Sequence, residues 1–279
     1  MLTQAEKGRA FAELHKRAGT FIIPNPWDVG SARLLTHLGF EALATSSAGY
    51  AFSIGKSDNA VGRDAMLAHA TSVAAATDLP LSIDLENGFG DAPESVADTI
   101  RRAAGTGAAG GSIEDATERA DDPIYERSLA VARIRAAAEA VRDLPFPFTL
   151  TARCENFLVG RPDLKDTIER LQMYQEAGAD VLYAPGLTTK EDIAAVVSSV
   201  DRPVNVLMGL KGVELSVADL SAIGVKRISV GSALARCALT ALLRGAREMK
   251  ENGTFRFADD AEAFQTINSL FANPVTKIS

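Results

Sequence analysis

The chain has 279 residues, of which 47% are hydrophobic, and a formal net charge of -7. Its acidic residues are scattered and its basic residues form no patch, which argues against a nucleic-acid partner or an anionic membrane surface. Cys154 and Cys237 make neither a disulfide framework nor a zinc spacing, and no apolar run reaches the ~18 residues that a membrane span requires. We therefore expect a cytoplasmic protein with a large apolar core and no membrane partner.

Short apolar segments alternate with longer helical patterns along the whole chain. Strands are expected at Phe21–Ile23, Ala42–Thr45, Leu81–Asp84, Gly111–Glu114, Thr149–Arg153, Val181–Ala184, Val204–Met208 and Arg227–Val230. Helices are expected at Ala32–Leu38, Arg63–Ala76, Pro93–Ala104, Ser128–Arg142, Asp166–Ala177, Lys190–Val200, Val217–Ala222 and Ala233–Lys250. Such alternation indicates parallel strands joined by helical crossovers. Eight repeats predict the α/β class and a closed (β/α)8 TIM barrel.

The expected barrel occupies about residues 20–250 of one domain that spans 1–279, since barrels of this type commonly need about 250 residues. A helical extension follows at about 255–279, with an extra helix expected at Asp259–Phe271. Within the barrel, Asp91 is expected to cap the helix at Pro93–Ala104, because a carboxylate precedes a first-turn proline.

Three acidic residues stand at the ends of neighbouring expected strands. Asp84 and Glu86 are two residues apart after the third strand, so on an extended backbone they project to the same side, and Glu114 ends the fourth strand. Carboxylates this close repel one another, and a hard divalent cation with oxygen ligands relieves that repulsion. The spacing therefore predicts a metal site on the face where barrels carry their active sites. The alternative is that each acid caps the helix that follows it.

Arg153 ends the fifth expected strand beside these acids. Its guanidinium suits a substrate carboxylate held by two hydrogen bonds, and the alternative is a structural ion pair with Glu155 or Glu114. Ser46 and Ser47 follow the second strand and either present hydroxyl and N–H groups to an anion or form an ordinary turn.

Three further residues lie near the expected strand ends. Trp27 follows the first strand and is expected either to wall the pocket or to pack in the core. Asn205, in the seventh strand, is assigned to substrate binding. Asp58 lies in a loop of turn composition, so its spacing alone predicts a solvent-exposed side chain.

From about Phe21 to about Arg236 the chain resembles the isocitrate lyase/phosphoenolpyruvate mutase superfamily. The motifs that carry the resemblance are Pro24-Asn25-Pro26-Trp27-Asp28, Ser31-Ala32-Arg33-Leu34, Ser46-Ser47-Ala48-Gly49-Tyr50, Asp84-Leu85-Glu86-Asn87-Gly88-Phe89-Gly90, Ile113-Glu114-Asp115 and Thr151-Ala152-Arg153. The family usually carries Asp-X-Asp-X-Gly-X-Gly at strand 3. Glu86 departs from that pattern and keeps the carboxylate.

The resemblance implies a cofactor, a ligand and an assembly. It implies that Asp84, Glu86 and Glu114 hold Mg2+, with Mn2+ as the alternative ion, directly or through water. It brings Asp58 into the metal shell and gives Arg153 a substrate carboxylate as its partner. The backbone around Ser46, Ser47 and Ala48 would bind the 2-oxo-carboxylate end of a small acid. Family members form homo-oligomers, dimers or tetramers, in which a C-terminal helix swaps between barrels.

The loop after the fourth strand departs from the family's lyases. These enzymes carry Lys-(Lys/Arg)-Cys-Gly-His in this loop, whereas residues 114–127 contain no Lys, Cys or His. The Lys and Asn of the phosphonate-handling members are missing too. Tyr125, Arg119 or water would then have to handle protons.

The resemblance and the loop together define the expected function. We expect an enzyme, a Mg2+-dependent lyase that cleaves a C–C bond next to the 2-oxo or 2-hydroxy acid group of a small di- or tricarboxylate through a metal-stabilised enolate, with an oxaloacetate-type decarboxylase as one form. The first alternative is a phosphonopyruvate-type P–C mutase or hydrolase. The second is a non-catalytic homologue that binds oxo acids.

Overall fold

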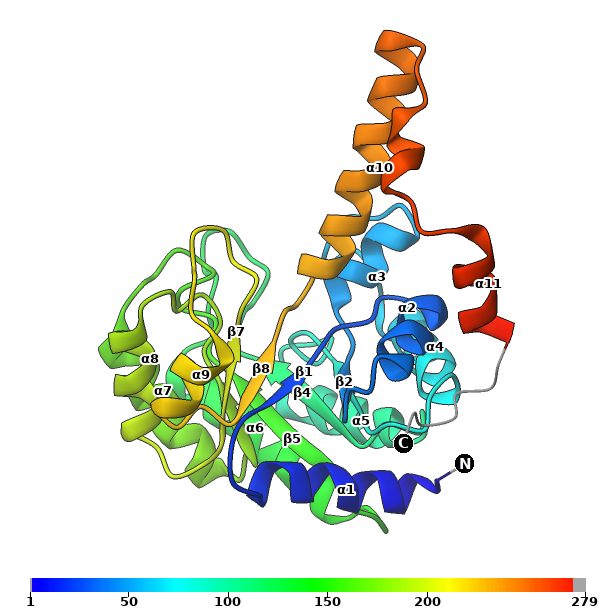
Figure 1. The fold of residues 1–279 in the computed structure, drawn as a ribbon. Coiled ribbons are helices and arrows are strands. Elements are labelled where there is room, and N and C mark those ends of the chain that lie inside the picture. The colour runs from blue at the N-terminus through cyan, green and yellow to red at the C-terminus, as the bar shows by residue number, and fades with distance from the viewer. Residues whose placement is uncertain (1, 273–279) are drawn as a thin grey trace.

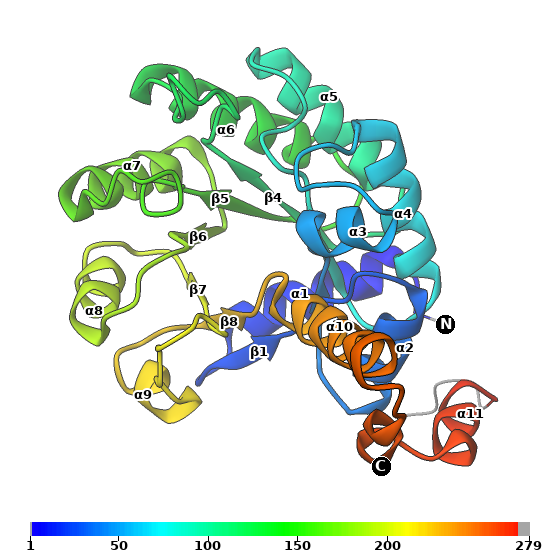
Figure 2. The ribbon, with the colours of Figure 1, turned by 90° about the horizontal axis from the view of Figure 1, so that it is seen from above.

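The computed structural model describes residues 2–272, and a ring of parallel strands forms its centre (Figure 2). The strands are β1 (Phe21–Ile23), β2 (Leu43–Ala44), β3 (Leu81–Asp84), β4 (Gly110–Glu114), β5 (Thr149–Arg153), β6 (Val181–Tyr183), β7 (Val204–Leu207) and β8 (Arg227–Ser229). They form one sheet in the order β1-β8-β7-β6-β5-β4-β3-β2. Between the two ends of that order, the Ala44 amide donates to the Pro24 carbonyl at 3.1 Å. The predicted (β/α)8 barrel is confirmed.

Helices surround the ring (Figures 1 and 2). They are α1 (Gln4–Lys16), α2 (Val29–His37), α3 (Ser47–Ser53), α4 (Arg63–Ala75), α5 (Pro93–Ala104), α6 (Arg127–Arg142), α7 (Leu164–Ala177), α8 (Lys190–Ser198), α9 (Val217–Ala222), α10 (Ala233–Asn252) and α11 (Phe264–Ala272), with a 3-10 helix η1 at Arg256–Asp260. The helix expected at Asp259–Phe271 is thus divided into η1 and α11. The rest of the expected extension, residues 273–279, lies outside the described residues.

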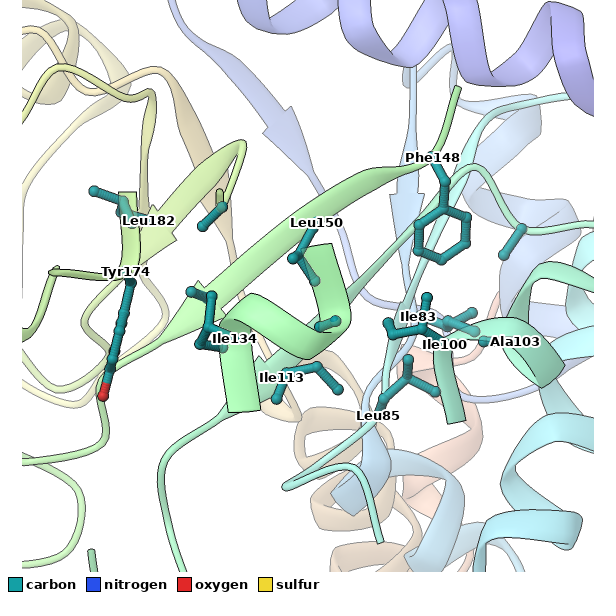
Figure 3. Packing of buried hydrophobic residues seen from close by; sticks show 14 of the residues in the cluster. Ile83, Leu85, Ile100, Ala103, Ile113, Ile134, Phe148, Leu150, Tyr174 and Leu182 are labelled. Atoms are coloured by element: carbon teal, nitrogen blue, oxygen red, sulfur yellow. The ribbon is translucent and has the colours of Figure 1, made fainter. Parts of the chain in front are cut away.

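Alternation along the strands separates an apolar outer layer from a polar interior. Ile83, Ile113 and Leu150 are buried on the helix-facing side, where Ile100 of α5 and Ile134 of α6 pack against the sheet (Figure 3). Because successive side chains of a strand point to opposite faces, the residues beside them face the barrel axis. These inward residues are polar on several strands, for example Ser82, Ser112 and Thr151. The barrel therefore presents polar groups to its own interior.

The two ends of the barrel are covered differently. Helix α1 lies across the N-terminal ends of the strands, where Phe11 and Leu14 pack with Phe21 (Figure 1). Helix α10 instead leaves the C-terminal end of β8 and projects away from the barrel, and only Ala235 and Gly245 of its residues are buried. The strand ends on the α10 side therefore remain accessible.

Within the described chain, no helix is long and apolar enough to cross a membrane.

Candidate metal and carboxylate-binding site

A cavity of about 170 Å3 lies inside the barrel and reaches the C-terminal ends of the strands. Its upper wall includes Ser47, Asp58, Asp84 and Arg153, and its deeper wall includes Arg227. The cavity is large enough for a small organic acid, because a single water needs only about 10–15 Å3 on the same measure. Of the three predicted metal acids, Asp84 lines this cavity with Arg153, whereas Glu86 lines a neighbouring hollow and Glu114 is buried against Arg153.

Arg153 lies at the centre of a group of three carboxylates. Its Nη1 donates to Asp84 Oδ1 at 3.0 Å and its Nε to Glu155 Oε1 at 2.9 Å. Its Nη2 forms an ion pair with Glu114 Oε2 at 3.0 Å. Burial alone would lower the pKa of Arg153, but the three carboxylates raise it well above its ordinary value. Burial raises the pKa of Glu114 in turn, although Arg153 opposes that rise. The structural pairing with Glu114 and Glu155 is thus present.

Glu86 lies beside this group in a strained backbone. Its φ of +50° falls in the left-handed region, which is uncommon outside glycine. Its side chain is buried, and within residues 2–272 its Oε1 has no hydrogen-bond partner. Burial, followed by repulsion from Asp84, raises the pKa of Glu86 to about 8. A buried carboxylate oxygen without a partner is costly, so a ligand at this oxygen would stabilise the ionised form.

Helix α3 brings further groups to the acids. The Ser47 amide donates to Asp84 Oδ2 at 3.1 Å, and the Ser47 hydroxyl donates to Asp58 Oδ1 at 3.2 Å. Ser46 caps the helix by accepting from the Gly49 amide. Burial and the nearby Asp84 raise the pKa of Asp58. Asp58 is solvent-exposed, as its spacing alone predicted, and it also lines the cavity.

The donor set fits a hard cation, with one qualification. Asp84 Oδ2, Glu114 Oε1 and Glu86 Oε1 are carboxylate oxygens that Arg153 does not hold, and oxygen donors are what Mg2+ prefers. In the part of the chain that the structure describes, however, no three acidic, His or Cys side chains are already gathered around one point. Arg153 shares the carboxylates of Asp84 and Glu114, so a cation would have to share them too.

The other expected substrate contacts divide into two groups. Ser46, Ala48 and Asn205 line the cavity. Trp27 does not, because its Cβ packs behind α3, where a Cβ at Gly49 would approach it to 2.9 Å. The expectation that Trp27 walls the pocket is therefore wrong, and its alternative, a packing role, agrees with this contact.

Tyr125 lies away from the cavity, which corrects its expected part in proton handling. It is 1% exposed, and its hydroxyl donates to Asp91 Oδ1 at 2.6 Å. Burial and that hydrogen bond raise the pKa of Tyr125 to about 12. The expected cap is wrong as well: Ala92 is the N-cap of α5 without a side-chain hydrogen bond, and Asp91 instead contacts Tyr125 and Arg119.

One acid and one arginine of the site escaped prediction, Glu118 and Arg227. Glu155, which the sequence offered as an alternative ion-pair partner of Arg153, completes the Arg153 group. Glu118 lines a hollow with Glu86 next to the cavity. Arg227 is the first residue of β8. A prediction that considers only the last residues of each strand therefore misses it.

Comparison with known proteins places the chain in a family. The family model described as phosphoenolpyruvate phosphomutase matches residues 11–250. A crystal structure of a proposed lyase/mutase from Burkholderia cenocepacia J2315 is 63% identical, covers 97% of each chain and superposes with a TM-score of 0.95. The 2-methylisocitrate lyase of Escherichia coli K12 is 31% identical over 65% of this chain and 62% of its own length. An oxaloacetate acetylhydrolase in complex with oxalate is 25% identical with a TM-score of 0.84, and 95% of this chain and 93% of that one are covered.

The chain therefore belongs to the phosphoenolpyruvate phosphomutase family, within the isocitrate lyase/PEP mutase superfamily. Its homologues are carbon–carbon lyases and mutases, and the chain is an enzyme of that type.

Proposed function

We propose that this member of the superfamily is a Mg2+-dependent lyase that cleaves the C–C bond next to the 2-oxo or 2-hydroxy acid group of a small di- or tricarboxylate, with an oxaloacetate-type substrate as one form. The observation that carries the proposal is the pairing of Asp84 and Glu114 with Arg153, together with the buried Glu86, whose Oε1 has no hydrogen-bond partner among the described residues. Other members of the superfamily use Mg2+. Mn2+ has the same preference for oxygen donors and is the alternative ion.

The binding step uses Arg153 and the start of α3. Arg153 carries five N–H donors and takes the acid group of the substrate through a charge-assisted pair. Asp58 and Ser47 hold the α3 side of the cavity in place through their 3.2 Å hydrogen bond. Ser46, Ala48 and Asn205 contribute the remaining wall around a small molecule.

Asp84, Glu86 and Glu114 would hold the metal. When bound, it supplies positive charge beside the oxygen that becomes negative as the C–C bond breaks, which lowers the barrier for forming an enolate. The chain's own part is to orient the acid on Arg153 and to keep water out. Glu114 and Glu155, both buried, hold the guanidinium plane in a fixed orientation.

Glu118 is a better candidate than Tyr125 for moving a proton. It lies on the loop after β4, which carries the proton donor in the family's lyases, and it shares a hollow with Glu86. Burial and the nearby Asp58 raise the pKa of Glu118, which lets its Oε atoms hold a proton closer to neutral pH. Decarboxylation would need no such group at the cleavage step, because CO2 leaves without taking a proton.

A turnover panel tests the proposal. The chain is incubated with C4–C7 oxo and hydroxy acids, with Mg2+ and with EDTA, and product formation is followed. We expect turnover of at least one acid that EDTA abolishes and Mg2+ restores. Turnover that EDTA leaves unchanged would contradict the metal role. Phosphate release from phosphonopyruvate would instead support a P–C mutase or hydrolase, and Mg2+-dependent oxalate binding without any turnover would support the non-catalytic homologue.

The segment from α10 to α11, residues 233–272, supports a homo-oligomer, and we call it the C-terminal arm. Helix α10 projects from the barrel with Leu242 66% exposed, and beyond it Phe255 is 66% and Phe264 79% exposed. Apolar side chains gathered on a projecting arm mark a contact surface. We propose that this arm packs on a second copy of the chain as a dimer or tetramer. Light scattering on the purified chain and on Leu242→Glu tests this, and a wild-type monomer would contradict it.

A further inference from the structure

Arg227 is buried inside the barrel without an acidic partner. It is 4% exposed and stands at the start of β8, from where its guanidinium crosses the interior. Its Nε donates to Asn205 Oδ1 at 2.8 Å and its Nη2 to Thr151 Oγ1 at 3.0 Å, and its Nη1 lies 3.3 Å from His15 Nε2. Within residues 2–272 it forms no ion pair, whereas Arg153 forms three. Buried charges are usually paired.

The partners of Arg227 leave its positive charge in place. Burial and the nearby Arg227 lower the pKa of His15 to about 3, so this ring is neutral and its Nε2 accepts. Its Nδ1 then donates to the Phe11 carbonyl at 2.8 Å. Burial lowers the pKa of Arg227 to about 10, so the guanidinium stays charged at neutral pH. Three of its five N–H donors are used on neutral acceptors, and two remain.

Two hydroxyl groups lie in the same deep part of the cavity. Ser82 of β3 and Ser112 of β4 line the cavity together with Arg227. Neither hydroxyl makes a hydrogen bond to another described residue, although Ser82 is 4% exposed. We use the name floor for Ser82, Ser112 and Arg227. The floor therefore has donors to spare and a net positive charge.

The upper part of the cavity has the opposite balance. Asp58, Asp84 and Arg153 line it, and Arg153 already forms ion pairs with Asp84, Glu114 and Glu155. A second acidic group of the substrate would meet more negative charge if it stayed at that level. Unpaired positive charge in a low-dielectric interior attracts an anion strongly, and the floor supplies it.

We propose that the floor is an anion subsite that takes the second acidic group of the substrate, so that the enzyme selects dianionic over monoanionic acids. This inference rests on the proposed function and names the residues that bind the second carboxylate of the substrate. Arg227 would donate its free N–H groups to the second carboxylate, and the hydroxyls of Ser82 and Ser112 would complete its hydrogen bonds.

A pair of unreactive probes isolates the subsite. Succinate and butyrate differ only in one terminal carboxylate, and neither can undergo the cleavage. Their dissociation constants are measured by calorimetry with saturating Mg2+. We expect succinate to bind the wild-type chain about 10- to 100-fold more tightly, as one charge-assisted contact implies. In Arg227→Gln the ratio of the two constants should fall close to one.

Arg133→Gln is the matched control. Arg133 is 1% exposed, donates to the carbonyls of Gly90 and Asp91, and does not line the cavity. Arg133→Gln therefore removes a buried guanidinium that has neutral partners and lies outside the floor. The ratio of the two dissociation constants should stay at the wild-type value in this variant. If Arg227→Gln does not fold, Ser112→Val carries the test, because its methyl groups fill the floor and should lower the ratio several-fold.

The outcomes separate the subsite from the proposed reaction. A wild-type ratio near one, or a high ratio kept in Arg227→Gln or in Ser112→Val, would overturn the subsite. Turnover of an oxo acid by a chain without succinate preference would overturn the subsite and leave the proposed function standing. A preference that Arg227→Gln removes, in a chain that turns over no acid, would support the subsite and count against the proposed function.

Discussion

Two arginines lie inside the barrel in opposite electrostatic surroundings. Arg153 pairs with Asp84, Glu114 and Glu155, while Arg227 contacts only neutral groups among residues 2–272. Acidic side chains therefore already neutralise the positive charge of Arg153, whereas the positive charge of Arg227 is not neutralised. Arg153 can receive a substrate carboxylate without a large excess of negative charge only when another cation offsets its acids. The difference teaches that the metal and Arg153 must act together, whereas Arg227 can attract an anion without a metal.

The largest expected effect falls on the acidic side of the cavity. Asp84→Asn should lower kcat/KM on the order of 10^3-fold, because it removes the charge of a proposed metal ligand that also pairs with Arg153. Asp180→Asn is the control at the opposite end of the barrel, where the carboxylate accepts from the Leu150 amide. Steady-state kinetics on the best substrate of the panel gives the comparison. Equal activity of the two variants would remove Asp84 from the site.

The stability of two variants sharpens the contrast between the arginines. Arg153→Met leaves three carboxylates without their cation and should cost about 3–5 kcal/mol in the free energy of unfolding. Arg227→Met leaves neutral groups such as Asn205 and Thr151 unpaired and should cost about 1–3 kcal/mol. Urea unfolding at neutral pH without Mg2+ measures both. A larger loss of unfolding free energy in Arg227→Met than in Arg153→Met would contradict the conclusion that acidic groups neutralise Arg153 and not Arg227.

The pH dependence of stability tests the raised pKa of Glu86. Because the pKa of Glu86 is raised to about 8, the folded chain binds more protons than the unfolded chain between about pH 4.5 and 8. The contribution of Glu86 to stability without Mg2+ should therefore fall as pH rises through this window, by about 4–5 kcal/mol. Glu86→Gln should flatten the curve there, and saturating Mg2+ should oppose the fall, since it favours the ionised carboxylate. A wild-type curve as flat as that of Glu86→Gln would contradict the expected shift.

The smallest effect is expected outside both regions. Tyr125→Phe removes the hydroxyl bond to Asp91 and should cost about 1 kcal/mol of stability. Turnover should change less than about threefold, because Tyr125 does not reach the cavity. Glu118→Gln provides the contrast, with a larger loss of turnover in any reaction that needs a proton donor. A larger loss in Tyr125→Phe would restore its role in proton transfer.

Period-two alternation explains how much of the site the sequence could predict. Asp84, Glu114 and Arg153 are the last residues of three consecutive strands, so their meeting at one face follows once a barrel is inferred. Helix α3 was harder, because seven residues rich in Ser, Gly and Ala are also typical of a turn, and the helix depends on packing against Trp27. Arg227 could not be placed, since its partners come from α1, β5 and β7.

Side-chain direction on loops explains the remaining errors. The sequence assigns Tyr125 to proton handling from its position on the loop after the fourth strand, and Asp91 to a helix cap from its position before Pro93. They contact each other instead, because Arg133 binds the loop before α5 and Tyr125 packs over that guanidinium. Pairings of this kind depend on how α5 and α6 pack, which the sequence pattern does not specify.

A crystal structure of the chain with Mg2+ and oxalate tests the central claim most directly. The account predicts one cation whose ligands include carboxylate oxygens of Asp84, Glu86 and Glu114, directly or through water. It also predicts that oxalate contacts both this cation and the Arg153 guanidinium. Oxalate bound to Arg153 with no cation beside it, or a cation held by other residues, would contradict the account.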